Sequence, residues 1–169
     1  MITPGWCHTM ARYNAWQNGN LLAAADTLDA AARGKDRGAW FGSIQGTLSH
    51  LLWGDLIWMS RFDGGDPPPK AGFAESATIF ADWAAYKRRR AATDARIVTW
   101  ASLLEPDALE GDLVWYSGAM GREMNKPRAI CIMQLFNHQT HHRGQVHAML
   151  TAAGARPGAT DLPFMPDEI

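Results

Sequence analysis

Apolar residues recur along most of this chain at three- to four-residue spacing, the period of a helix with one buried face. Between residues 6 and 32 the pattern contains no proline, and it stops at Gly34, a residue that commonly follows a helix C-terminus. Residues 44–62 follow Ser43, a good N-cap, and carry apolar side chains on almost every face. We therefore expect two long helices here, the second of them buried on several sides.

The second half of the chain predicts two further helices. One is expected over residues 76–104, ending before Pro106. The other begins at Pro127, which suits the first helical turn, and continues to residue 150 or 153 before Gly154 closes it. The sequence therefore contains four helical segments of substantial length.

Three segments interrupt this helical pattern. Residues 63–69 read Asp-Gly-Gly-Asp-Pro-Pro-Pro and begin a linker that cannot be helical. Residues 111–126 favour a small β-hairpin or an extended excursion, and residues 155–169 favour coil that wraps over the surface. We predict an all-α fold, a four-helix bundle with a long crossover between helices two and three and the hairpin or excursion before helix four.

Composition narrows the class of protein. The 169 residues suit one domain spanning 1–169, and 16 Lys+Arg against 17 Asp+Glu give a net charge of -1. We expect no nucleic-acid partner, because the positive field behind most non-specific nucleic-acid affinity is missing. Cys7 and Cys131 are too few for a disulfide framework, and neither a signal-peptide pattern nor a run of about 18 apolar residues occurs. A cytoplasmic protein without membrane contact is expected.

The histidines are the main candidates for chemistry, because four of the six lie between residues 138 and 147. At about 100° per residue, His138 and His142 lie about 40° apart and one turn along their helix, so both imidazoles can reach one point. His141 and His147 point more toward solvent. The pair by itself is weak evidence for a metal, since this spacing also arises by chance.

His50 strengthens the case, because it is the one histidine in the very apolar segment 44–62 and a buried imidazole needs a polar partner. Three neutral imidazoles from two helices can hold a metal ion and leave positions open for water or substrate. Such an ion can activate water or a thiol for attack. Gly54, one turn after His50 on the same face, leaves room for a ligand there.

Three stretches carry a family resemblance. The first is 43–51 (SIQGTLSHL), which is followed by Trp58 and Arg61, and the second is 137–145 (NHQTHHRGQ). The third, 13–18 (YNAWQN), supports them. In order and spacing they resemble the signature stretches of the DinB/YfiT-like family over nearly the whole chain. The resemblance implies a four-helix bundle, often a homodimer, with one divalent metal ion held by three histidines. It does not choose among nickel, zinc and iron.

Residue by residue, the resemblance places the metal ligands at His50, His138 and His142. It also implies a metal-dependent hydrolase or a transferase that uses a low-molecular-weight thiol such as bacillithiol or mycothiol, although many members have no known substrate. The leading hypothesis is therefore a metal-dependent enzyme with a small-molecule substrate that the sequence does not identify.

Two other hypotheses remain. In the first, the protein is a non-enzymatic, stress-related dimer whose structural or sensory metal has a closed coordination sphere, for instance with His141 or a carboxylate as fourth ligand. In the second, Cys131 carries out thiol chemistry without a metal, although no histidine is clearly placed as its base. The sequence favours the metalloenzyme over both.

Several further side chains belong to the neighbourhood of the proposed metal. Gln145 is expected in the pocket or behind a ligand, and Cys131 could line the pocket, although a buried inert thiol is the commoner fate. Arg143 points away from the metal and is expected to form a structural salt bridge. Asp55 and Asp161 are candidate partners for the second nitrogen of a ligating imidazole.

Two other patterns are explained by solvation and by core packing without a functional site. The basic run 87–90 favours a solvated helix face over an anion site. The tryptophans at helical spacing favour core and interface packing over a cofactor site, although indoles near a metal would make a wide apolar cavity suited to a hydrophobic electrophile.

Overall fold

The computed structural model describes residues 1–167, and 61% of them are helical. Within this range the α-helices are α1 (Pro4–Asp26), α2 (Ala30–Gly34), α3 (Ile44–Phe62), α4 (Trp83–Ser102) and α5 (Arg128–Ala152). The strands β1 (Asp112–Ser117) and β2 (Arg122–Pro127) form a two-stranded antiparallel sheet. The protein is thus mostly helical with one small sheet, as the hydrophobic pattern predicts.

Capping side chains explain where the two central helices begin. Helix α3 starts at Ile44 as predicted, because the Ser43 hydroxyl accepts the backbone N–H of Gly46 over 2.9 Å. Helix α4 starts only at Trp83, since the Asp82 carboxylate accepts the backbone N–H of Ala85 over 2.6 Å. The predicted start at residue 76 is wrong, because residues 75–77 form a single 3-10 turn. The linker therefore extends over residues 63–82.

The first predicted helix, 6–32, is divided in two. Helix α1 ends at Asp26, where the Thr27 hydroxyl donates to the carbonyl oxygen of Ala24 over 2.7 Å. Asp29 then caps the short helix α2 by accepting the backbone N–H of Ala32 over 2.7 Å. Short polar side chains compete with the helical backbone for hydrogen bonds, and here they end one helix and begin another.

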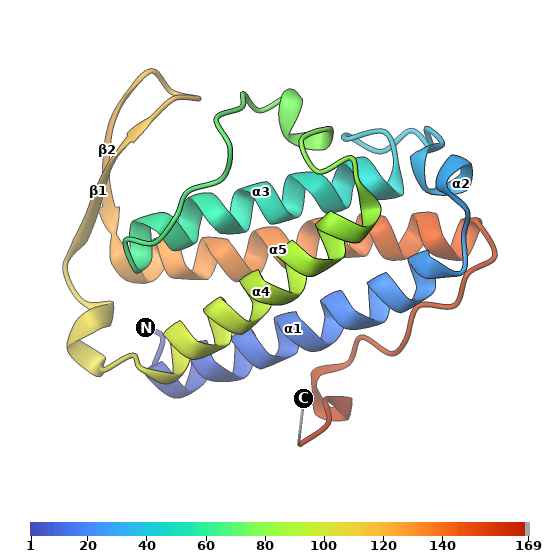
Figure 1. Ribbon diagram of the computed structural model, residues 1–169. Coiled ribbons are helices and arrows are strands. Elements are labelled where there is room, and N and C mark those ends of the chain that lie inside the picture. Colours follow the sequence, from blue (N-terminus) through green and yellow to red (C-terminus); the bar gives the residue numbers. More distant parts are fainter. Residues whose placement is uncertain (168–169) are drawn as a thin grey trace.

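The segment before α5 forms a hairpin, one of its two predicted forms. Strand β1 pairs with β2 in a register that places Asp112 opposite Pro127 and Ser117 opposite Arg122. Gly121 has a φ of 62°, which suits glycine in the tight turn between the strands. The hairpin leads directly into α5 and stands beside the end of α3 (Figure 1).

The four long helices lie side by side (Figure 1). Helix α1 packs against α4 and α5, and α3 packs against α5 and α4. One group of buried apolar residues surrounds Leu52 and Leu150, and a second surrounds Ile97 and Phe136. The contact between α3 and α5 matters most for function, because the candidate histidines come from these two helices.

A buried ion-pair network accompanies the apolar core. Arg90 is 1% exposed and pairs with Asp55 over 2.7 Å and with Asp94 over 2.8 Å. The prediction of a solvated face for residues 87–90 therefore fails at Arg90, although Arg88 and Arg89 are exposed. A cation can be buried here because two carboxylates compensate its charge.

The C-terminal segment follows the prediction of coil, apart from a 3-10 turn at Leu162–Phe164. It lies along α1, where Gln17 donates to the carbonyl oxygen of Ala159 over 2.8 Å and Tyr13 donates to that of Thr160 over 2.6 Å. Residues 168 and 169 of the predicted tail and domain lie outside the described residues. In the described part of the chain, no helix has the length and apolar character required to cross a membrane.

Candidate metal centre

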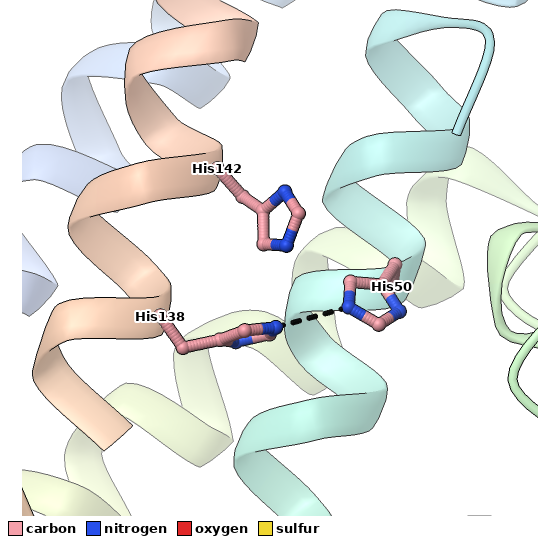
Figure 2. Close-up of side chains that lie close together, drawn as sticks. All are labelled: His50, His138 and His142. Carbon is pink, nitrogen blue, oxygen red and sulfur yellow. Dashed lines mark hydrogen bonds between the residues drawn. The ribbon is translucent and has the colours of Figure 1, made fainter. Parts of the chain in front are cut away.

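Three histidines converge where α3 packs against α5 (Figure 2). His50 comes from α3, and His138 and His142 come from successive turns of α5. One ring nitrogen from each of the three lies within 4.8 Å of the others, and the Nε2 atoms of His50 and His138 are 3.0 Å apart. The helical spacing and the packing of two helices together produce this cluster.

The surroundings of the cluster keep the imidazoles neutral. Burial, together with the two neighbouring histidines, lowers the pKa of His50 to about 3. Burial likewise lowers the pKa of His138 to about 4 and also lowers the pKa of His142. Neutral imidazole is the form that binds a metal ion, so at neutral pH no proton has to leave before one binds.

An aromatic lid adds to the burial of His50. The ring of Phe41, from the segment before α3, stacks on His50 with centroids 3.8 Å apart, and Phe73 from the linker lies 5.2 Å from the same ring. His50 is only 1% exposed as a result. The two phenylalanines fix the plane of the imidazole as well as excluding water from it.

A hydrogen-bond chain fixes the tautomer of His50. The Ser76 hydroxyl donates its hydrogen to the carbonyl oxygen of Phe73 over 2.6 Å. Its oxygen therefore accepts the bond from Nδ1–H of His50, which spans 2.8 Å. The lone pair of His50 is left on Nε2, the nitrogen that faces His138.

Gln145 fixes the tautomer of His142 in the same way. The side-chain oxygen Oε1 of Gln145 lies 2.8 Å from Nδ1 of His142. A carbonyl oxygen only accepts hydrogen bonds, so Nδ1 carries the hydrogen and the lone pair lies on Nε2. Gln145 therefore supports a candidate ligand from behind, one of the two roles expected from its position on the helix.

His138 differs from the other two histidines. Its Nδ1 is buried and has no hydrogen-bond partner among residues 1–167. The ring lies directly against Gly54, where an added Cβ would approach Cε1 of His138 to 3.0 Å and Nδ1 to 3.4 Å. Gly54 is therefore the residue that gives this imidazole its room.

These features fit a bound divalent metal ion. Two nitrogen ligands at about 2.1 Å from one ion lie roughly 3.0–3.4 Å apart, which matches the separation of the Nε2 atoms of His50 and His138. The lone pairs on His50 and His142 already belong to Nε2, so two ligands are oriented before binding. The three histidines form a group that can hold a metal ion.

A cavity of about 720 Å³ lies beside the cluster and contacts His50 and His138. Its walls come from α3, α5, the linker and the hairpin, and the linker arches over α3 in Figure 1. Four aromatic side chains line it, and they are Trp53, Trp58, Phe73 and Trp115. Trp53 and Trp58, whose helical spacing favoured core and interface packing, thus also line a wide apolar cavity beside the candidate metal ligands.

Other predicted neighbours of the metal lie elsewhere. Cys131 is buried and is not among the residues that line this cavity. Asp55 pairs with Arg90 and accepts a bond from Gln139, and Asp161 is exposed on the C-terminal segment. Among residues 1–167, neither carboxylate bonds to a histidine, because helix packing commits Asp55 to Arg90.

Two more residues of α5 can be compared with expectation, and one of them, Arg143, departs from it. Arg143 is buried, and it bonds to the side-chain oxygens of Asn14 and Gln139 rather than forming an ion pair with any residue in the described range. His141 is exposed, as predicted, with its ring centroid 4.8 Å from that of His142. The metal-capable group in the described chain does not include His141.

Sequence reasoning did not find Ser76, Phe41 or Phe73. The first of these was assigned to the start of a helix, and the other two lie in irregular segments where no periodicity indicates a direction. The linker reaches His50 only through the tertiary fold. Phe41 lies in the short segment 39–43, which is held by the isolated β-bridge between Ala39 and Gly42.

Fold and site together define a mostly helical protein with a three-histidine group compatible with metal binding. Comparison with known families matches residues 1–168 to the DinB family, and the chain therefore belongs to that family. Neither the curated proteins nor the solved structures contain a significant match. The family and the geometry of the site are thus the basis for a functional assignment.

Proposed function

We propose that this protein is a metal-dependent enzyme, a hydrolase or a low-molecular-weight-thiol S-transferase, with His50, His138 and His142 as its metal ligands. The observation that carries the proposal is the position of the cluster, where neutral imidazoles border an apolar cavity large enough for a small molecule. When bound, a divalent ion would supply the Lewis acidity that activates water or a thiol. Nickel, zinc and iron all accept imidazole ligands.

The protein's own side chains have separate tasks in this proposal. Ser76 and Gln145 hold two imidazoles with their Nε2 lone pairs free. The aromatic walls, with Trp53 and Phe73 nearest to His50, favour an electrophile with an apolar body and limit the access of water. The substrate class is therefore an apolar small molecule, with the thiol as cosubstrate in the transferase case.

The alternative is a structural or sensory metal in a non-enzymatic protein. The burial of two candidate ligands favours it, since His50 is 1% exposed and His142 is 8% exposed. A structural ion has a complete set of protein ligands, whereas a catalytic ion keeps a position for an external ligand. The coordination of the bound ion therefore distinguishes the two functions.

Metal analysis of the purified protein is the first test. We expect about one divalent ion per chain after anaerobic purification, and a large loss of bound metal in H50A, H138A and H142A. H147A is the matched control, because His147 lies on the same helix outside the cluster and should retain the metal. Full occupancy in H138A or H142A would overturn the proposal.

A cobalt(II) derivative tests whether the ion accepts external ligands. We expect the visible spectrum of cobalt-loaded protein to change when cysteine or 2-mercaptoethanol is added, because a thiolate enters the coordination sphere. A spectrum that does not respond to either thiol or to azide would favour the structural metal. A screen of apolar electrophiles with bacillithiol, mycothiol and water then assigns the reaction.

The overall organisation expected from the sequence stays part of the proposal. We propose one domain, built as a four-helix bundle with residues 63–82 as its crossover, and the pairwise helix contacts support it. A homodimer is supported by an apolar groove between α1 and α5, where Ile130 and Met133 are 43% and 36% exposed. The unpaired thiols of Cys7 and Cys131 support a cytoplasmic location.

A further inference from the structure

Arg61 shares the cavity with the candidate metal ligands. It follows His50 by eleven residues on α3, which at about 100° per residue returns it to within roughly 20° of the same helix face. The two residues are about 16 Å apart along the axis, and helical side chains lean toward the N-terminus, so the guanidinium extends back toward the histidines. Both residues line the cavity of about 720 Å³.

The guanidinium of Arg61 has aromatic neighbours and no carboxylate partner. Its Cζ lies 4.7 Å from the ring centroid of Trp58 and 5.2 Å from that of Trp115. Within residues 1–167 it makes no hydrogen bond or ion pair. Asp63, the nearest carboxylate in sequence, is committed to Arg96 over 2.6 Å. Half-buried arginines without an anion are unusual, since burying a charge is costly unless it is paired.

The charge of the cavity has one sign. No aspartate, glutamate or lysine lines it in the described chain, and Arg61 is its one arginine. Arg61 is therefore the charged side chain of its wall, and a divalent ion at the histidines would add to the positive potential. Burial lowers the pKa of Arg61, as expected for a cation partly removed from water with no carboxylate partner, and the Cys131 thiol opposes this effect.

We propose that Arg61 binds the carboxylate of an apolar, carboxylate-bearing substrate whose body lies along the aromatic wall of the cavity. The planar guanidinium offers two parallel N–H donors, the geometry that a carboxylate accepts, and the flanking indoles hold its plane. The position of the reactive end, at the histidines, rests on the proposed function. Carboxylate binding at Arg61 does not depend on it.

The competing role for Arg61 is purely structural. By contacting both Trp58 of α3 and Trp115 of β1, the guanidinium would attach the hairpin to the helix without any ligand. The two roles differ in one measurable property, which is the preference of the cavity for an acid over a neutral molecule of the same shape.

Calorimetry with naphthylacetate and naphthylacetamide measures that preference. In wild-type protein treated with a chelator, we expect the acid to bind about 10- to 100-fold more tightly than the amide, the range of a hydrogen-bonded charge pair. R61M should bind the two probes equally, with unchanged affinity for the amide, and R61K should keep part of the preference. R88M, which removes an exposed arginine of α4, is the control for net charge and should keep all of it.

Equal affinity of wild-type protein for acid and amide would overturn the proposal, as would a full preference retained by R61M or no binding of the acid at millimolar concentration. If R61M does not fold, phenylglyoxal labelling of wild-type protein gives the second measurement. The acid, and not the amide, should protect Arg61 from labelling in the mass spectrum, and labelling unaffected by the acid counts against the subsite. Because the chelated protein is used, this result is independent of the metal analysis.

Discussion

His50 donates Nδ1–H to the hydroxyl oxygen of Ser76 over 2.8 Å, so a linker residue sets the tautomer of a histidine in the middle of α3. The Ser76 hydroxyl hydrogen is already given to Phe73, which leaves its oxygen free to accept. The candidate metal centre is thus supported from a segment that contributes no ligand. Second-nitrogen partners of this kind orient ligands and increase their basicity.

Replacing Ser76 by alanine tests this support. S76A leaves the buried Nδ1–H of His50 without an acceptor, so we expect metal affinity to fall about 10- to 100-fold. Competition with a chromogenic chelator measures it. T78A, which removes an exposed hydroxyl from the same linker, should bind metal like the wild type. Wild-type affinity in S76A would show that the bond does not orient the ligand.

Replacing Gly54 by alanine tests the close approach of His138. The new Cβ would lie 3.0 Å from Cε1 of that ring, which forces the imidazole away from His50. We expect weaker metal binding and a cobalt spectrum altered from that of wild type. G19A is the matched control, because nothing lies within 4 Å of a Cβ at that helical position. It should bind metal normally and gain about 0.5–1 kcal/mol of stability.

The stability of the metal-free protein should depend on pH through the buried histidines. Burial holds the folded-state pKa of His50 at about 3 and that of His138 at about 4, whereas unfolded histidine titrates near 6.5. As pH falls below about 6.5 the unfolded chain gains protons that the folded chain does not. The free energy of unfolding therefore falls from pH 6.5 to about 4 through His138 and to about 3 through His50, by at most about 1.4 kcal/mol per pH unit for each histidine.

Urea unfolding in the presence of a chelator measures this slope. H50Q removes one of the titrating groups and should make the pH dependence shallower. T78A, which removes an exposed hydroxyl and no titrating group, should keep the wild-type slope. A slope for H50Q equal to that of wild type would contradict the assignment of the effect to His50.

The ion-pair network around Arg90 should contribute more to the free energy of unfolding than a partly exposed ion pair does. R90M leaves Asp55 and Asp94 buried without their cation, and we expect a loss of about 3–5 kcal/mol in the free energy of unfolding. R96M removes the cation paired with Asp63, where both side chains are about a quarter exposed, and should cost about 1 kcal/mol or less. Urea denaturation of both variants compares them, and equal losses would refute the expected difference.

Local sequence signals predicted several boundaries and failed where distant contacts decided them. Ser43 identified the start of α3 because a cap acts on the next few residues. The start of α4 was placed too early, since periodicity alone did not show that Ser76 bonds to His50 while Asp82 caps the helix. The break after Asp26 was missed because alanine-rich sequence on both sides favours helix.

The candidate site shows the same division between local and distant information. Angular spacing on one helix placed His138 and His142 on a common face and turned His141 outward, because 3.6 residues per turn is a property of the backbone. It also placed Gln145 near the site. It did not reveal Arg90 as a buried residue, since a run of four basic residues is normally solvated. The burial of Arg90 depends on two aspartates, from α3 and α4, that compensate its charge.

By itself, the sequence determined the four long helical segments, a hairpin or extended segment before α5 and the histidines able to share a metal ion. These depend on local backbone preferences and on periodicity, which act over a few residues. Only the tertiary structure decided which nitrogen of each supported histidine is free, which aromatic residues wall the cavity, and that Arg61 lies in it without a carboxylate partner. Such contacts join residues distant in the chain, and their energies depend on burial, which no local pattern specifies.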